Sequence, residues 1–201
     1  MKFKKHSIFS PYFYQVSLDE DCSELRKSLI DKIIQISLLE GKNDNAWNIH
    51  TSFHDDVIPE LNDYKNIYNK YINAFIKKVL KSDSKYSINR IWYNIYREGE
   101  SGLIHTHSGE NRCFFSCVHY LKFNPEIHNS ITFLNPRRAS NKSLAKQNIE
   151  FKNLDFYKDE FTPNLKEDDL IFFPANLAHK VEPSTTDEPR ITIAFNIGLN
   201  D

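Results

Sequence analysis

The sequence has only three cysteines, Cys22, Cys113 and Cys117, and they fit no common cysteine framework. An odd number cannot pair completely in disulfides, and no two have the C-x-x-C spacing of zinc or redox sites. Cys113 and Cys117 would be about 13 Å apart in one extended strand, which is too far for a single bond to join them. We therefore expect a reducing compartment, the cytoplasm.

Long apolar runs and an excess of charge are also missing. Residues 1–16 begin with basic side chains but contain no continuous apolar segment and no small-residue cleavage site, so no secretion signal is indicated. No stretch approaches the roughly 18 consecutive apolar residues of a membrane helix. With 26 Lys and Arg against 27 Asp and Glu, the net charge of -1 gives the whole chain no attraction for nucleic acid or an anionic membrane.

Internal repeats and low-complexity linkers are absent as well. A chain of 201 residues, 40% of them hydrophobic, can bury one sizeable core, so we expect a single domain over residues 1–201. Residues 136–160 are polar and rich in lysine, which predicts an insertion loop and a candidate lid.

The part of the chain from about residue 17 to residue 82 has helical periodicity. Asp21 and Ser23 are candidate N-caps for a helix that Gly41 would end. A second apolar stripe begins just after Pro59 and continues to Val79. Two amphipathic helices need a surface to pack against.

Residues 88–198 supply that surface. The pattern changes there to short apolar and aromatic runs separated by Gly, Pro, Asn and Asp: "INRIWYNIY", "CFFSCVHYLKF", "ITFL", "DLIFFP" and "RITIAFNIG". The expected fold class is mainly β with supporting α, a β core braced by N-terminal helices.

Three histidines are candidate metal ligands. Side chains alternate along a strand, so His105 and His107 in "IHTHSG" would point to the same side, and His179 follows a strongly apolar strand. Two ligands close in sequence and one distant ligand leave coordination positions open for other molecules. Eleven residues after His179, Arg190 and Thr192 share a strand face and form a candidate clamp for a carboxylate.

Each of these features also has an ordinary structural interpretation. The pair His105 and His107 alone fits two polar side chains on an exposed strand, and Arg190 alone fits a salt bridge with Asp187 or Glu188. His119 would point to the face opposite Tyr120, which indicates a structural role. The segment "HTSFHDD" is expected to be a solvated turn rather than a second metal site.

Taken together, these motifs resemble those of the iron(II)- and 2-oxoglutarate-dependent dioxygenases. The prolyl-hydroxylase-like branch is the most similar, with H-x-D/E, a distal His and R-x-S/T, and "YREGESGLIH" matches a pattern with Tyr96 and Gly99 before the first ligand. More narrowly, the motifs resemble those of mostly uncharacterised 2-oxoglutarate oxygenases of bacteria and phages in which the short motif is H-x-H. The resemblance covers about residues 88–198 and implies a double-stranded β-helix, a jelly-roll and cupin-like core.

The resemblance implies a function and a set of site residues. It implies Fe(II) as cofactor, 2-oxoglutarate and O2 as cosubstrates, and hydroxylation of an unactivated C–H bond coupled to decarboxylation of 2-oxoglutarate to succinate and CO2. It assigns the metal to His105, His107 and His179, and 2-oxoglutarate to Arg190, Thr192, Tyr120 and Tyr96. Candidate substrate-binding residues are Trp92, Asn94 and Arg137.

The main departure from the broader family is His107, which stands where most members have a carboxylate. Glu110 or a water molecule are alternative occupants of that coordination position. A prolyl or peptidyl substrate is expected by analogy with the branch. The alternatives are a small metabolite, a nucleobase, or a sensor that binds metal or 2-oxoglutarate without turnover. The sequence does not indicate an oligomeric state.

Overall fold

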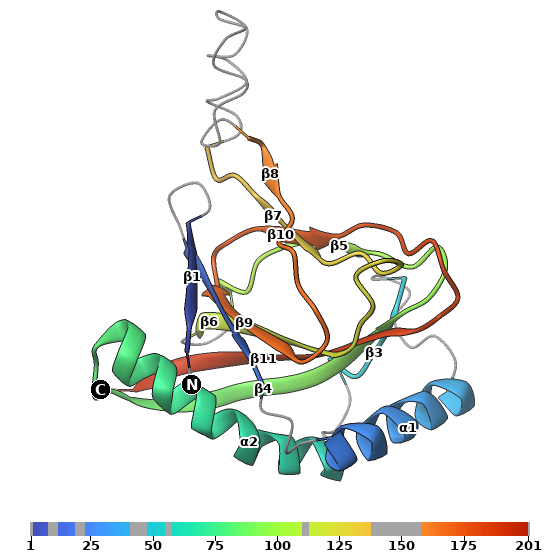
Figure 1. Cartoon of the computed structure of the whole chain (residues 1–201), viewed down its shortest axis with the longest axis horizontal. Helices are drawn as coiled ribbons and strands as arrows, with labels where there is room; N and C mark the ends of the chain where they lie inside the picture. Colours follow the sequence, from blue (N-terminus) through green and yellow to red (C-terminus); the bar gives the residue numbers. More distant parts are fainter. Residues whose placement is uncertain are drawn as a thin grey trace, which may run out of the picture.

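Two antiparallel β-sheets lie face to face in the computed structural model, and helices cover the outer face of the larger sheet (Figure 1). The structure describes residues 2–7, 12–18, 23–40, 48–54, 58–109, 113–137 and 158–200. The candidate cap Asp21, Gly41, Cys22, the alternative ligand Glu110 and residues 138–157 of the expected insertion lie outside these residues.

The larger sheet has the strand order β1-β2-β9-β6-β11-β4-β3, and the smaller sheet has the order β5-β10-β7-β8. The strands of the larger sheet are β1 (Lys4–Ser7), β2 (Tyr12–Ser17), β3 (His50–Thr51), β4 (Lys85–Tyr96), β6 (Cys113–Lys122), β9 (Asp169–Pro174) and β11 (Arg190–Asn200). Those of the smaller sheet are β5 (Gly102–His105), β7 (Ile131–Leu134), β8 (Glu160–Phe161) and β10 (His179–Val181). The sheets are not closed into a barrel. Their arrangement confirms the mainly β fold class and the double-stranded β-helix.

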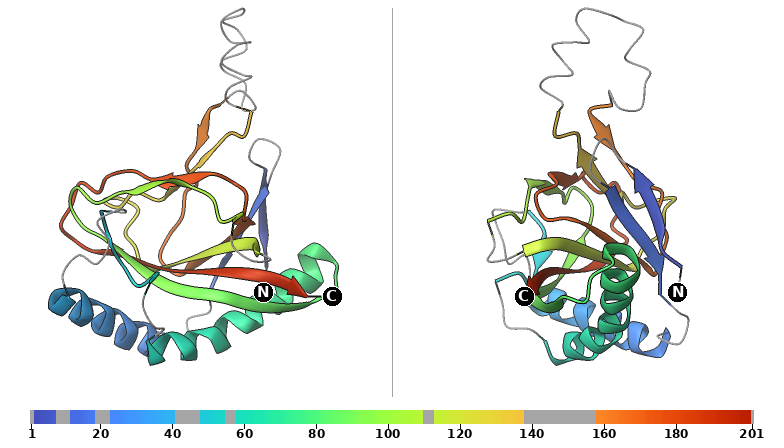
Figure 2. Two further views of the ribbon diagram at one scale, coloured as in Figure 1. Left: turned by 180° about the vertical axis from the view of Figure 1, so that it is seen from behind. Right: turned by 90° about the vertical axis from the view of Figure 1, so that its left-hand side faces the viewer.

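The two expected helices are α1 (Ser23–Glu40) and α2 (Pro59–Phe75), and α2 continues into a π-helical turn, η2 (Ile76–Leu80). Pro59 stands in the first turn of α2, where its missing N–H costs no hydrogen bond. Apolar residues spaced three or four apart form the buried face of α2, which packs on the larger sheet: the Phe75 and Phe172 rings are 4.5 Å apart, and those of Tyr68 and Phe195 are 4.6 Å apart. Both further views keep the helices on the side of this sheet away from β5 and β10 (Figure 2).

Side chains along β11 point alternately to the two faces of the larger sheet, and the two faces have different roles. Ile191, Ile193 and Phe195 belong to the core under the helices. Arg190 and Thr192, on the opposite face, line a cavity between the sheets. A second aromatic core, which includes Tyr120 and Phe133, fills the neighbouring space between the sheets, so the polar residues of the site are held in a packed frame.

The structure differs from the sequence-based expectation near the N-terminus. Strands β1 and β2 extend the larger sheet, although no strand was expected there. The segment "HTSFHDD" is not a solvated turn at its start, because His50 and Thr51 are 1% and 4% exposed and form β3 against β4. His50 Nε2 is 3.2 Å from the Tyr93 hydroxyl, so a polar pair satisfies the buried imidazole. Within the described residues, no helix is long and apolar enough to span a membrane.

Candidate metal and 2-oxoglutarate site

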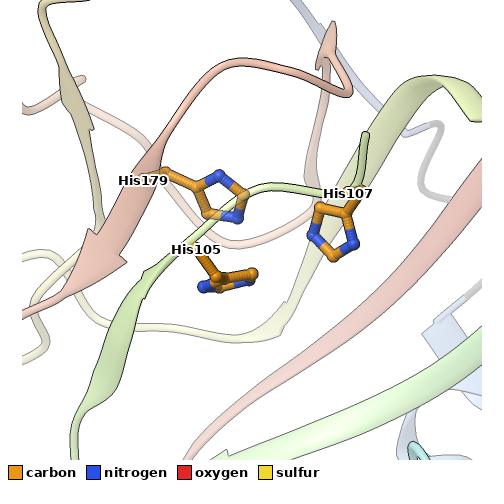
Figure 3. A group of neighbouring side chains, drawn as sticks. All are labelled: His105, His107 and His179. Atoms are coloured by element: carbon orange, nitrogen blue, oxygen red, sulfur yellow. The ribbon is translucent and has the colours of Figure 1, made fainter. Parts of the chain in front are cut away.

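The three predicted histidines converge in the wall of the cavity (Figure 3). His105 ends β5 and lies directly across from His179 on β10, with ring centroids 4.2 Å apart. His107 lies beyond the end of β5, in a bend that its backbone N–H fixes by donating to the Ala175 carbonyl at 2.8 Å. One potential ligand atom from each ring lies within 4.8 Å of the others. Strand alternation therefore does not explain the approach of His107, since β5 has already ended.

Backbone carbonyls orient two of the three rings. Nδ1 of His105 is 2.7 Å from the Leu103 carbonyl, and Nδ1 of His179 is 2.9 Å from the Leu177 carbonyl. Because a carbonyl only accepts hydrogen bonds, each Nδ1 must carry the proton, which leaves the lone pair on Nε2. This arrangement is the usual way in which a protein prepares an imidazole to bind a metal.

The environment also keeps His179 uncharged. Burial lowers the pKa of His179 well below its usual value, and the nearby His105 and His107 lower it further. Metal binding requires the neutral imidazole, so this donor is in the competent protonation state at neutral pH. His107 is 7% exposed and His105 is half-buried, so the cluster lies at the cavity wall.

Arg190 is a buried cation in the same cavity, with only 3% of its surface exposed. Its guanidinium stacks on Tyr96 at 4.5 Å and on Tyr120 at 5.3 Å. Among the described residues, no group accepts a hydrogen bond from its Nε or Nη1, although both atoms are buried. A buried cationic donor requires a partner, and the planar fork of a guanidinium matches a carboxylate.

Neutral hydroxyl groups surround this cation. Burial raises the pKa of Tyr96 and of Tyr120, and Arg190 only partly opposes it, so both phenols keep their protons at neutral pH. The Tyr120 hydroxyl accepts a hydrogen bond from the Ile131 N–H at 3.1 Å. Thr192 is buried beside them and lines the cavity. The corner therefore combines one positive charge with several hydrogen-bonding hydroxyls.

The cavity itself has a volume of about 240 Å³. No acidic residue is among the described residues that line it. Trp92, Asn94 and Tyr96 from β4 form part of the wall. Its polar groups are thus suited to an anionic ligand that extends from the histidines to Arg190.

The other predicted residues are placed less centrally. Arg137 is exposed and outside the cavity lining, and Tyr120 contacts the site through Arg190 rather than through the cavity wall.

Several residues at or near the cavity were not predicted to belong to the site. Thr51 and Phe53 reach the wall through the unexpected strand β3 and the turn after it. Gly102 also lines the cavity, and a Cβ at this position would be 3.1 Å from the Tyr96 hydroxyl. Asn196 and Ser116, which lie behind His107, form a hydrogen bond of 2.9 Å. The period of two along β11 would have placed Asn196 on the same face as Arg190, but nothing in the sequence relates it to a histidine about 90 residues earlier.

Comparisons with known proteins agree with this geometry. Residues 90–196 match the model of a protein family described as "Putative 2OG-Fe(II) oxygenase". This segment contains His105, His107, His179, Arg190 and Asn196. A search of the curated proteins finds no match.

Solved structures with the same fold include three prolyl hydroxylases. The prolyl-4-hydroxylase of Pseudomonas putida is 11% identical, with 94% of this chain and 93% of that chain covered and a TM-score of 0.61. The viral collagen prolyl hydroxylase of Paramecium Bursaria Chlorella virus-1, solved as a 2OG complex, is 15% identical, with 94% and 96% covered and a TM-score of 0.60. A Trichoplax adhaerens prolyl hydroxylase, in complex with a peptide fragment of the hypoxia inducible factor, is 11% identical, with 92% and 83% covered and a TM-score of 0.61.

Proposed function

Because the chain belongs to the 2OG-Fe(II) oxygenase family and is a 2-oxoglutarate-dependent oxidoreductase, we propose that it hydroxylates an unactivated C–H bond with Fe(II) and 2-oxoglutarate bound between its two sheets. In this reaction 2-oxoglutarate loses CO2 and becomes succinate. One oxygen atom of O2 enters succinate, and the other enters the substrate as a hydroxyl group.

His105, His107 and His179 would hold the metal. They fit it because the three rings present nitrogen donors to one point and because two of them have their Nδ1 protons already committed to backbone carbonyls. Three protein ligands leave coordination positions open for the cosubstrates. Fe(II) and 2-oxoglutarate, when bound, supply the oxidising chemistry, and the residues of the chain supply position and environment.

Arg190 would hold the carboxylate of 2-oxoglutarate that is farther from the metal. The buried Nε and Nη1 of this residue, which no described group satisfies, are the observation that carries the proposal, because Arg190 lines the same cavity as the three histidines. The Thr192 hydroxyl and the neutral phenol of Tyr96 can donate to the same carboxylate. These contacts would fix the direction in which the cosubstrate lies.

The substrate would enter along the wall formed by Trp92 and Asn94, where it meets the open side of the histidine cluster. We propose a peptide, with a prolyl residue as the hydroxylated group. This proposal is supported by the prolyl hydroxylases that share the fold, one of which is solved with a bound peptide.

The proposal is tested by succinate formation from 2-oxoglutarate with Fe(II) and O2, with and without proline-containing peptides. Wild-type protein should form succinate slowly alone and faster with a substrate peptide. His179→Ala should abolish both rates, and His54→Ala, which alters an exposed histidine, should leave them unchanged. Absence of succinate from folded wild-type protein that binds Fe(II) and 2-oxoglutarate would contradict the enzymatic proposal.

A further inference from the structure

The side chain of Asn196 lies behind His107, on the side away from the other two histidines. We infer that Asn196, together with Ser116, is a positioning residue that determines which ring nitrogen of His107 can bind the metal. The inference rests on the proposed function, because it concerns the third ligand of that site. The contact with Asn196 makes His107 different from the other two candidate ligands.

Ser116, Asn196 and His107 form a buried series of side-chain contacts. Asn196 Nδ2 is 3.5 Å from His107 Nδ1, and the Ser116 hydroxyl donates to Asn196 Oδ1 at 2.9 Å. Asn196 and Ser116 are 0% and 1% exposed, and they are cross-strand partners on β11 and β6. The backbone register of the larger sheet therefore sets where the amide lies.

Nδ1 of His107 lies near a side-chain amide, in contrast to Nδ1 of His105 and of His179. Nδ1 of His105 and Nδ1 of His179 each donate a hydrogen bond to a backbone carbonyl, which can only accept one. An amide has both an accepting and a donating end, so it does not by itself determine where the proton of His107 lies. One ring nitrogen of His107 faces the other two imidazoles (Figure 3), and since Nδ1 is the nitrogen near Asn196, the facing nitrogen is Nε2.

The two orientations of the amide have opposite consequences. With Nδ2 toward the ring, Nδ1 is the acceptor, so the proton of the neutral ring is on Nε2 and blocks the lone pair that would bind the metal. With Oδ1 toward the ring, Nδ1–H donates to the amide and Nε2 is available. The Ser116 hydroxyl accommodates both, because it can donate to Oδ1 or accept from Nδ2. Binding of the metal through His107 therefore requires the second orientation, and Asn196 and Ser116 must change together.

This coupling makes His107 a conditional ligand. His105 and His179 are prepared in advance, whereas His107 joins them only when the buried amide presents its oxygen. A carboxylate at the position of His107 would need no such device, because it has no ring proton to place. We therefore expect Asn196 to affect metal affinity without contacting the metal.

The test uses three variants of the full chain, a fourth variant that serves only for assignment, and two readouts. The first readout is the nitrogen chemical shifts of His107 in ¹⁵N-histidine-labelled, metal-free protein, assigned by their loss in His107→Gln. The second is the affinity for Co(II), used as a stable substitute for Fe(II). Asn196→Leu removes the acceptor, and Asn196→Asp provides an acceptor with no donating end. Ser116→Ala removes the hydroxyl that, in this structure, donates to Oδ1 and so holds the amide oxygen away from the ring.

Asn196→Leu should weaken Co(II) binding by about 10- to 100-fold, the usual effect of losing a hydrogen-bond partner of a metal ligand. Asn196→Asp should restore the wild-type affinity or exceed it, and its His107 should carry the proton on Nδ1 in the metal-free protein. Ser116→Ala should bind Co(II) at least as tightly as wild type. This order of affinities would not arise from a structural role, because the buried charge of the aspartate would then be the most disruptive change.

Unchanged Co(II) affinity in folded Asn196→Leu, or a His107 tautomer that is the same in all variants, would overturn the inference. If Asn196→Leu does not fold, the comparison of Asn196→Asp and Ser116→Ala with wild type still decides it. Failure of the proposed function is a separate result, in which wild-type protein binds no Co(II), and the tautomer measurement needs no metal.

Discussion

Replacing Arg190 by methionine should show whether this residue serves to bind a ligand or to stabilise the fold, because the two roles predict different effects of the substitution. If Arg190 is kept for a ligand, its removal should abolish 2-oxoglutarate binding and leave the ligand-free protein about as stable as before. If Arg190 is structural, its removal should destabilise the protein. Methionine has a similar length and is apolar, so it fills the space between the two tyrosine rings.

The magnitude follows from the contacts of the guanidinium. Loss of its stacking on Tyr96 and Tyr120 costs about 0.5–1 kcal/mol for each ring, and contacts of the methionine sulfur with the same rings return part of that. Against this, each of the two buried donors without a described acceptor, Nε and Nη1, costs about 1–3 kcal/mol in the ligand-free protein. The free energy of unfolding should therefore stay within about 1 kcal/mol of wild type or rise. Loss of a charged partner for the carboxylate should weaken 2-oxoglutarate binding by about 2–5 kcal/mol, which is roughly 30- to 4,000-fold.

The assay is thermal unfolding with and without 2-oxoglutarate in the presence of Co(II). Wild-type protein should show a rise in Tm with 2-oxoglutarate concentration, and Arg190→Met should show none. Arg97→Met is the matched control, because the Arg97 guanidinium donates to the Ser37 hydroxyl at 2.8 Å and does not line the cavity. A loss of more than about 3 kcal/mol in ligand-free Arg190→Met, combined with an unchanged response to 2-oxoglutarate, would show that Arg190 is structural.

Two further predictions concern the packing of the site and the response to acid. Gly102→Ala should raise the KM for 2-oxoglutarate with little change in kcat, because the new Cβ would lie 3.1 Å from the Tyr96 hydroxyl and displace that hydroxyl from Arg190. Gly109→Ala is the control, because a Cβ at Gly109 would have no atom within 4 Å. Equal KM values for the two variants would disprove the crowding at Gly102. Burial lowers the pKa of His119 and of His179, so the unfolded chain binds more protons than the folded chain near and below the ordinary pKa of about 6.5. The free energy of unfolding should therefore be highest above this pH and fall as the pH decreases from 7 to 5, by up to about 1.4 kcal/mol per pH unit for each fully buried histidine. Denaturant unfolding of the metal-free protein across this pH range measures the effect. A free energy of unfolding that does not change with pH would contradict the prediction.

Much of the fold and of the site could be predicted because the relevant signals are local. The alternation of apolar residues in "RITIAFN" places Arg190 and Thr192 on one face, and the structure has them there. The apolar stripe after Pro59 became α2 and η2. Its buried residues in α2 are Leu61, Tyr64, Tyr68, Tyr71, Ile72 and Phe75, whereas Val79 in η2 is only partly buried. His179 could be joined to His105 only through a motif, because the cross-strand register that brings the two together depends on chain pairing and not on local pattern.

The remaining features depend on long-range contacts that a single sequence does not reveal. His107 approaches the cluster through a bend held by the Ala175 carbonyl, so the argument from strand alternation was wrong for it, although the structure does bring the residue to the other two histidines. Thr51 reaches the cavity because a two-residue strand pairs with β4, and such a short segment has no periodicity to detect. Asn196 acquires its proposed role only from its place behind His107.

The central claim is that three histidines hold Fe(II) while Arg190 holds 2-oxoglutarate in the cavity between the two sheets. A crystal structure of the protein grown without oxygen in the presence of Fe(II) and 2-oxoglutarate, with anomalous scattering recorded at the iron edge, tests it most directly. The account predicts an iron peak bonded to Nε2 of His105, His107 and His179, and a 2-oxoglutarate carboxylate paired with the Arg190 guanidinium. An iron peak away from the three rings, or 2-oxoglutarate bound without contact to Arg190, would contradict it.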